Sequence, residues 1–333
     1  MKLNKLFTAA CVLFTLTVSA VFAAKKPADG QKLKIVTTIF PEYDWVKEIV
    51  GENADNIELT LLLNNGVDLH SYSPSVKDIA KIAGSDIFIY VGGESDEWVE
   101  DVLKNAKNPD LKAINLLEVL GERVKEEEIV EGMEHEHEHN HHESEHHHDE
   151  HEEEPEYDEH VWLSLRNAKI LCGAICDALS EKDSANSSIY KANLLSYTKK
   201  LDALDSEYTK TVKTAGTKTL LFGDRFPFRY LVDDYGLTYY AAFAGCSAES
   251  EASFKTIAFL SEKVNELNLK SVCQIESGNG KIAKTVISNS KNKKAKVLTF
   301  DSMQSVTAKQ IKKGADYLGI MEKNLSVLKE ALR

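Results

Sequence analysis

The sequence lacks the short motifs that mark several classes of enzyme. It has five cysteines in 333 residues, and no two of them have the CxxC spacing of a zinc or redox motif. It has no GxSxG segment, which argues against a hydrolase with a nucleophile elbow. Neither GKS nor GKT follows the GNG turn at 278–280, so that turn is not a phosphate-binding loop. Catalysis is therefore not the expected function.

The chain also has no excess of positive charge. Its formal net charge is −13, with 40 basic and 53 acidic residues. The stretch 134–159 alone holds thirteen acidic residues and no Lys or Arg, so subtraction, −13 − (−13), leaves the rest of the chain near neutral. No basic field remains to attract phosphates, and nucleic-acid binding is not expected.

Long apolar runs are absent beyond the N-terminus. Residues 1–23 have a short basic region, an apolar stretch and small residues near Ala23, which is typical of a cleaved secretory signal peptide. An uncleaved N-terminal anchor is the alternative. No later run approaches the ~20 apolar residues of a membrane span. We therefore expect an exported protein, located in a periplasm.

Histidine is concentrated in one acidic tract. Residues 134–151 hold nine of the eleven histidines, interleaved with Glu. Neutral imidazole is the commonest protein ligand for metals such as Zn²⁺, and His-rich tracts of this kind indicate metal binding. A solvated acidic loop is the plainer interpretation, but acidity alone does not require nine histidines. A flexible tract holds no fixed geometry, so the main site must lie elsewhere.

Short β-branched runs alternate with helical patterns in both halves of the chain. This alternation predicts an α/β protein with two similar (β/α)4 lobes, parallel sheets, and one long connecting α-helix. The expected strands are 33–40, 56–63, 86–91, 111–117, 219–222, 237–243, 269–275 and 296–300. The expected helices are 42–50, 76–83, 163–180, 183–215, 226–234, 253–267, 281–288 and 307–331.

These patterns suggest a division of the chain. An N-terminal lobe is expected over 24–182, with a disordered His-rich acidic loop at about 121–159. A linker helix over 183–215 then leads to a C-terminal lobe over 216–333. Cys172 and Cys176 are read as core residues. Cys246 and Cys273 each border an expected strand, and whether they form a disulfide stays open.

The two histidines outside the tract lie in segments that resemble a known family. His70 follows an expected strand in GVDLHSYSPS, and His160 lies in YDEHVWL. These segments resemble the G-x-D-P-H-x-Y-x-P and D-P-H-x-W-L motifs of solute-binding proteins of zinc and manganese ABC transporters, with Leu69 in place of the usual Pro. The His-rich loop and the long connecting helix add to the resemblance, which covers the whole mature chain.

The resemblance implies a metal site in the cleft between the lobes. His70 and His160 are its implied imidazole ligands. Asp301, which ends the last expected strand, is the implied carboxylate. The remaining ligand position, after the first strand of the second lobe, departs from the family. One alignment places Asp224 there and another places Arg225, whose guanidinium has no lone pair to donate to a metal. Asp224 is the preferred ligand, although a helix cap is an alternative role for it. Glu276, water and a histidine of the His-rich loop are the other candidates for this position.

The implied function is extracytoplasmic Zn²⁺ binding and delivery to the permease of a metal ABC transporter, by a monomer. Two imidazoles favour Zn²⁺, carboxylates shift preference toward Mn²⁺, and the His-rich loop tips the choice to zinc. A manganese-binding relative and a zinc buffer or adhesin stay open. Zinc with an open coordination position can activate water, but no HExxH segment includes His70 or His160, so an enzyme is not expected.

Overall fold

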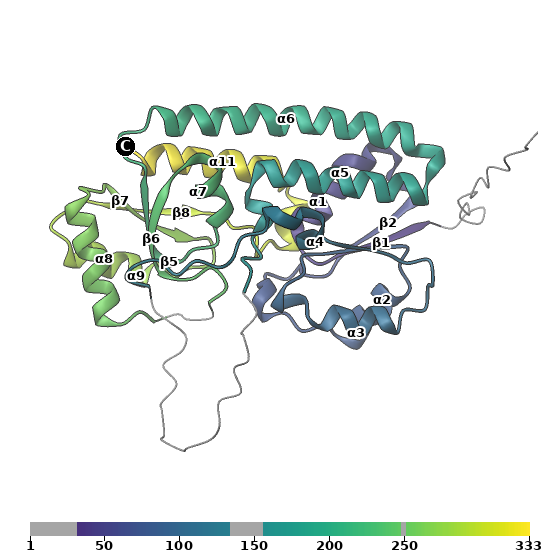
Figure 1. The fold of residues 1–333 in the computed structure, drawn as a ribbon, viewed down its shortest axis with the longest axis horizontal. Helices are drawn as coiled ribbons and strands as arrows, with labels where there is room; N and C mark the ends of the chain where they lie inside the picture. Colours follow the sequence, from purple (N-terminus) through teal and green to yellow (C-terminus); the bar gives the residue numbers. More distant parts are fainter. Residues whose placement is uncertain (1–31, 134–155, 248–250) are drawn as a thin grey trace, which may run out of the picture.

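Two parallel sheets, one in each half of the chain, form the centres of two α/β lobes (Figure 1). The computed structural model describes residues 32–133, 156–247 and 251–333. The expected signal peptide and the histidine tract lie outside the described residues. Within the described part of the chain, no helix is both long and apolar enough to cross a membrane. The α/β class with two lobes is confirmed.

The first lobe has the strand order β2-β1-β3-β4, with every neighbouring pair parallel. Its strands are β1 (Leu33–Thr37), β2 (Ile57–Leu61), β3 (Ile87–Tyr90) and β4 (Lys112–Asn115). Its helices are α1 (Phe40–Val50), α2 (Val76–Ala83), α3 (Trp98–Lys104) and α4 (Leu116–Leu120). β1 and β3 are apolar and buried along nearly their full length, as is usual for the inner strands of a parallel sheet.

The second lobe repeats this plan with the order β6-β5-β7-β8. Its strands are β5 (Thr219–Arg225), β6 (Thr238–Phe243), β7 (Ser271–Ile275) and β8 (Lys296–Phe300). Its helices are α7 (Arg229–Tyr235), α8 (Phe254–Glu266), α9 (Lys281–Asn289), α10 (Ala308–Lys312) and α11 (Tyr317–Ala331). In both lobes the carboxyl ends of the strands carry the loops that approach the inter-lobe boundary, the usual place for a ligand site in open α/β sheets.

Two helices join the lobes. The 18-residue α5 (Leu165–Lys182) packs on the 27-residue α6 (Ser187–Lys213), and α6 extends over both lobes beside α11 (Figure 1). Tyr208 of α6 donates its hydroxyl to the carbonyl of Met321 on α11 (2.7 Å). Most of the buried apolar residues form one cluster that spans both lobes, which holds the lobes against each other.

Several details differ from the sequence expectations. Phe40 and residues 116–117, expected at the ends of strands, begin helices α1 and α4, and helix α3 was not expected. The single helix expected over 307–331 is two helices, because the chain turns at Gly314 with φ of 89°. β5 continues three residues past Phe222 to Arg225, with an irregular register there. Residues 121–133 and 156–159, expected within a disordered loop, make defined contacts: Glu126 pairs with Tyr157, and the Lys125 amide donates to Tyr230 Oη (3.0 Å). The middle of the expected loop lies outside the described residues.

Candidate metal centre

His70 is held in a short turn that follows β2. Asp68 caps this turn, and its Oδ1 accepts the backbone N–H of His70 (3.1 Å). The ring Nδ1 of His70 forms a hydrogen bond with the hydroxyl of Ser95 (2.8 Å) and lies 3.4 Å from Oε2 of Glu159. Burial raises the pKa of the Glu159 carboxyl, but hydrogen bonds from His70 and Ser95 outweigh burial, so this pKa lies below its ordinary value.

His160 lies just before α5 and is completely buried. Oδ1 of Asp158 accepts both the backbone N–H of His160 (2.8 Å) and its ring Nδ1–H (3.0 Å). The ring also packs against Trp162, with centroids 5.3 Å apart. A carboxylate that holds one imidazole nitrogen fixes the ring orientation and leaves the other nitrogen as a metal donor, a recurring arrangement around bound metals.

The two imidazoles point their Nε2 atoms at each other. Nε2 of His70 lies 3.1 Å from Nε2 of His160. Carboxylate oxygens of Asp158 and Glu159 lie 3.0 Å and 3.4 Å from the Nδ1 atoms of His160 and His70, which favours the tautomers with the ring proton on Nδ1. In these tautomers both Nε2 atoms carry lone pairs. A tetrahedral Zn²⁺ with Zn–N bonds of ~2.05 Å would place two ligand nitrogens about 3.3 Å apart. The pair is therefore arranged to share one cation.

Cys246 is the third side chain of a metal-ligating type at this point. In the described part of the chain, one group of three or more His, Cys, Asp or Glu side chains has all its donor atoms within 4.8 Å of one another: His70, His160 and Cys246. Cys246 follows β6 in the second lobe, and neither it nor the buried Cys273 is in a disulfide. From the sequence alone, Cys246 is a candidate for a disulfide and not for a metal ligand.

Asp224 and Arg225 lie outside this group. Both oxygens of Asp224 accept backbone N–H groups, Oδ1 from Arg225 (3.0 Å) and Oδ2 from Ile275 (3.2 Å). Burial raises the pKa of the Asp224 carboxyl. The guanidinium of Arg225 forms an ion pair with Asp68 of the other lobe. These side chains line a hollow of about 270 Å³ beside the imidazoles.

Asp301 and Glu276 also lie outside the group. Oδ1 of Asp301 accepts the backbone N–H of Met303 (2.9 Å), and burial, with the nearby charge of Glu276, raises the pKa of Asp301 to about 6. The Glu276 carboxylate accepts the N–H (2.7 Å) and hydroxyl (2.9 Å) of Ser302 and the hydroxyl of Ser305 (3.1 Å). Of the four predicted ligands, the structure thus brings together the two histidines.

Gln304 is a second residue that sequence reasoning missed. It is buried, and its side-chain amide nitrogen lies 2.9 Å from Nε2 of His160. Because this imidazole nitrogen carries a lone pair, the amide donates to it. A metal ion that binds to His160 must displace this hydrogen bond. The only available signal was the position of Gln304 just after β8, where cleft residues are expected.

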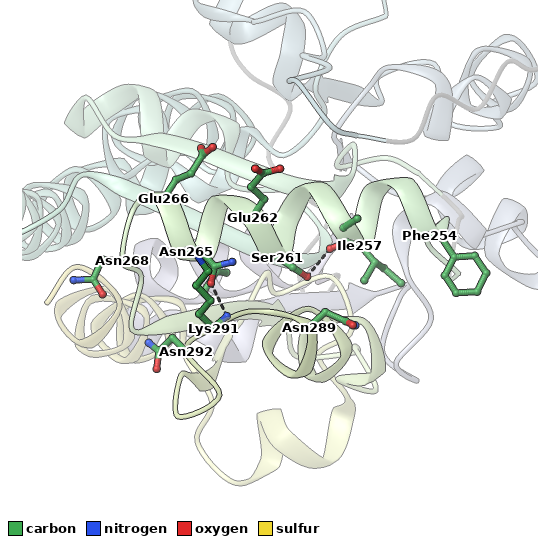
Figure 2. A pocket seen from close by; sticks show the side chains of 12 residues that line it. Phe254, Ile257, Ser261, Glu262, Asn265, Glu266, Asn268, Asn289, Lys291 and Asn292 are labelled. Atoms are coloured by element: carbon green, nitrogen blue, oxygen red, sulfur yellow. Dashed lines mark hydrogen bonds between the residues drawn. The ribbon is translucent and has the colours of Figure 1, made fainter.

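A larger hollow of about 860 Å³ lies away from the imidazoles, between α8 and α9 (Figure 2). Its labelled side chains include Glu262, Asn265 and Lys291, with Phe254 at one end of α8. Amides and aliphatic groups predominate in this lining, and it contains no His or Cys. The hollow therefore offers no metal-binding set comparable to the imidazole pair.

Comparisons with known proteins match nearly the whole chain. The family model described as "Zinc-uptake complex component A periplasmic" matches residues 35–331. The zinc-binding protein AdcA of Streptococcus pyogenes serotype M3 is 32% identical over 310 residues, covering 92% of this chain. This chain spans only 57% of that relative's length. The high-affinity zinc uptake system protein ZnuA of Bacillus subtilis is 32% identical over 333 residues, covering 99% of this chain and 98% of the relative.

Solved structures agree with the two-lobe fold. The Zn(II)-bound ZnuA-like domain of Streptococcus pneumoniae AdcA has a TM-score of 0.68 and 27% identity, covering 90% of this chain and 99% of that domain. The metal-dependent lipoprotein YcdH of Bacillus subtilis has a TM-score of 0.70 and 28% identity, with 90% and 99% covered. Sequence and fold comparisons thus agree on the same group of proteins.

Proposed function

Because the chain belongs to the family of the periplasmic component A of the zinc-uptake complex, we propose that it binds Zn²⁺ outside the cytoplasm and delivers it to the permease of an ABC transporter. The observation that carries this proposal is the pair of imidazoles whose Nε2 atoms lie 3.1 Å apart. Two imidazole nitrogens this close have nearly the ~3.3 Å spacing of two ligands on one tetrahedral Zn²⁺, so both can donate to a single cation. Imidazole donors favour Zn²⁺ over Mn²⁺.

His70 and His160 are the proposed imidazole ligands. Asp224 and Asp301 stay predicted carboxylate ligands, but each already accepts backbone N–H groups, so each would have to exchange those bonds for the metal. A ligand from the second lobe would let the metal fix the lobes relative to each other. A permease could then distinguish the filled form from the empty one.

The proposed mature protein begins near residue 24 and functions as a monomer. Its proposed parts are an N-terminal lobe over 24–182, a linker helix over 183–215 and a C-terminal lobe over 216–333. The family is one of solute-binding proteins for transport. The histidine tract at 134–151 is proposed to raise the local Zn²⁺ concentration near the cleft.

Competitive titration with Zn²⁺ and Mn²⁺ tests this function. The mature protein should bind one Zn²⁺ tightly, with weak competition from Mn²⁺, and His160→Ala should abolish that binding. Asp202→Asn is the matched control, because Asp202 lies on the exposed face of α6 in a pair with Lys169. Preference for Mn²⁺ would favour the manganese branch. Binding that survives His160→Ala but disappears when 134–151 is deleted would favour a zinc buffer.

A further inference from the structure

We propose that the thiolate of Cys246 is the second lobe's ligand to Zn²⁺, so that the centre is formed by His70, His160 and Cys246. This inference rests on the proposed function and specifies its coordination chemistry. The donor atoms of the three residues all lie within 4.8 Å of one another. Two donors come from the loops of the first lobe, and the sulfur comes from the loop after β6 in the second.

The backbone around Cys246 is fitted closely to His160. A Cβ atom on Gly245 would lie 3.0 Å from Cε1 and 3.2 Å from Nδ1 of His160, and 2.9 Å from the carbonyl oxygen of Phe226. Only glycine lets the loop approach the imidazole this closely. The N–H of Cys246 donates to Oε1 of Glu127 (3.0 Å), which ties the loop to the first lobe. The loop that carries the thiol is thus held by contacts on both sides.

The other candidates in the second lobe are already engaged. Arg225 pairs with Asp68, and a guanidinium has no lone pair to offer a metal. Both oxygens of Asp224 accept backbone N–H groups. Glu276 accepts three hydrogen bonds from Ser302 and Ser305. Among these side chains, Cys246 alone belongs to the donor group around the two imidazoles.

The distances fit a zinc thiolate after a small closure. Zn–S bonds of ~2.3 Å and Zn–N bonds of ~2.05 Å give a tetrahedral N···S separation of about 3.6 Å. The donor atoms now lie within 4.8 Å of one another, so the sulfur has to move toward the nitrogens by at most about 1.2 Å. On binding, the S–H bond breaks, sulfur keeps the electron pair and forms the S–Zn bond, and the proton passes to water. The fourth position is left for Asp301, the predicted carboxylate, or for water.

This ligand set has a consequence for selectivity. A thiolate is a soft donor that favours Zn²⁺, whereas Mn²⁺ prefers carboxylate, carbonyl and water oxygens. Cys246 would therefore strengthen the preference for zinc within the folded lobes themselves. Selectivity would then not depend on the histidine tract at 134–151.

The inference is tested by Co²⁺ substitution and by Zn²⁺ titration of the mature protein. Wild-type protein loaded with Co²⁺ should show a near-ultraviolet band from thiolate-to-cobalt charge transfer. Cys246→Ser should lose this band and weaken Zn²⁺ binding by more than about 100-fold, beyond the 10–100-fold that loss of an outer-sphere partner costs. Mn²⁺ binding should weaken less. Cys176→Ser, which alters a buried cysteine on α5, should keep both the band and the affinity.

Two further variants separate the possible failures. Cys246→Asp should lose the band but bind Zn²⁺ more tightly than Cys246→Ser, which shows that a donor at this position is needed. If wild-type protein shows no band and Cys246→Ser binds Zn²⁺ normally while His160→Ala does not, the thiolate inference is overturned and the proposed function stands. If His160→Ala also binds normally, the proposed function itself is wrong.

Discussion

Replacing Asp158 by Asn tests how strongly the buried carboxylate supports His160. Both side chains are nearly inaccessible, with exposed fractions of 3% for Asp158 and 0% for His160. One oxygen, Oδ1, accepts two hydrogen bonds from His160, at 2.8 Å and 3.0 Å. Asparagine keeps the shape and can still accept both bonds, but it removes the negative charge that makes Nε2 a stronger donor.

The expected loss in Zn²⁺ affinity is 10- to 100-fold, which corresponds to about 1.4–2.7 kcal/mol. The upper end applies if the Asn amide turns its NH₂ group toward Nδ1. That orientation shifts the imidazole proton to Nε2, and the nitrogen that should bind the metal then has no lone pair. The expected binding defect thus arises from the lost charge and the changed tautomer rather than from lost packing.

The assay is Zn²⁺ competition against a chromophoric chelator, with urea unfolding of the metal-free protein as the check on folding. Asp202→Asn removes an equally charged but exposed side chain on α6 and should leave the affinity within about twofold of wild type. A folded Asp158→Asn protein with wild-type affinity would refute the reasoning. In that case the carboxylate would be structural, and the tautomer of His160 would not depend on it.

Three further predictions concern other parts of the molecule. Gly245→Ala should lower the free energy of unfolding by about 1–3 kcal/mol and weaken Zn²⁺ binding, because the added Cβ meets Phe226 and His160. An unchanged melting temperature and an unchanged Zn²⁺ affinity would contradict this. Burial raises the pKa of Asp96 from 3.8 to about 7, so the folded state keeps the carboxyl proton to a higher pH than the unfolded state does. The free energy of unfolding therefore falls as pH rises from 4 to 7. Asp96→Asn should remove up to ~4 kcal/mol of that pH dependence in urea unfolding, and an unchanged slope would exclude Asp96 as its source. Deleting 134–151 should slow Zn²⁺ capture in stopped-flow mixing but leave one tight site; loss of that site would contradict an auxiliary role for the tract.

The secondary structure followed from local patterns because the relevant interactions are local. β-branched runs such as 33–40 and 296–300 predict strands, and the uninterrupted periodicity over 183–215 predicts the long helix. Errors arose where local signals compete. The turn at Gly314 divides the last expected helix, and the bulged end of β5 extends past Phe222. Periodicity alone does not determine such boundaries.

The sequence by itself determined the two-lobe α/β class, because strands and helices alternate along the chain. It also identified both histidines of the imidazole pair, because each histidine lies in a short motif of neighbouring residues. Only the tertiary structure placed Cys246 and Gln304 beside them. These residues lie 86 and 144 positions from His160, and contacts between the lobes decide which loops meet. Trp162 donating to the carbonyl of Ser302 (2.8 Å) is one such contact. Proximity across lobes depends on how the helices dock the two sheets, which no local pattern encodes.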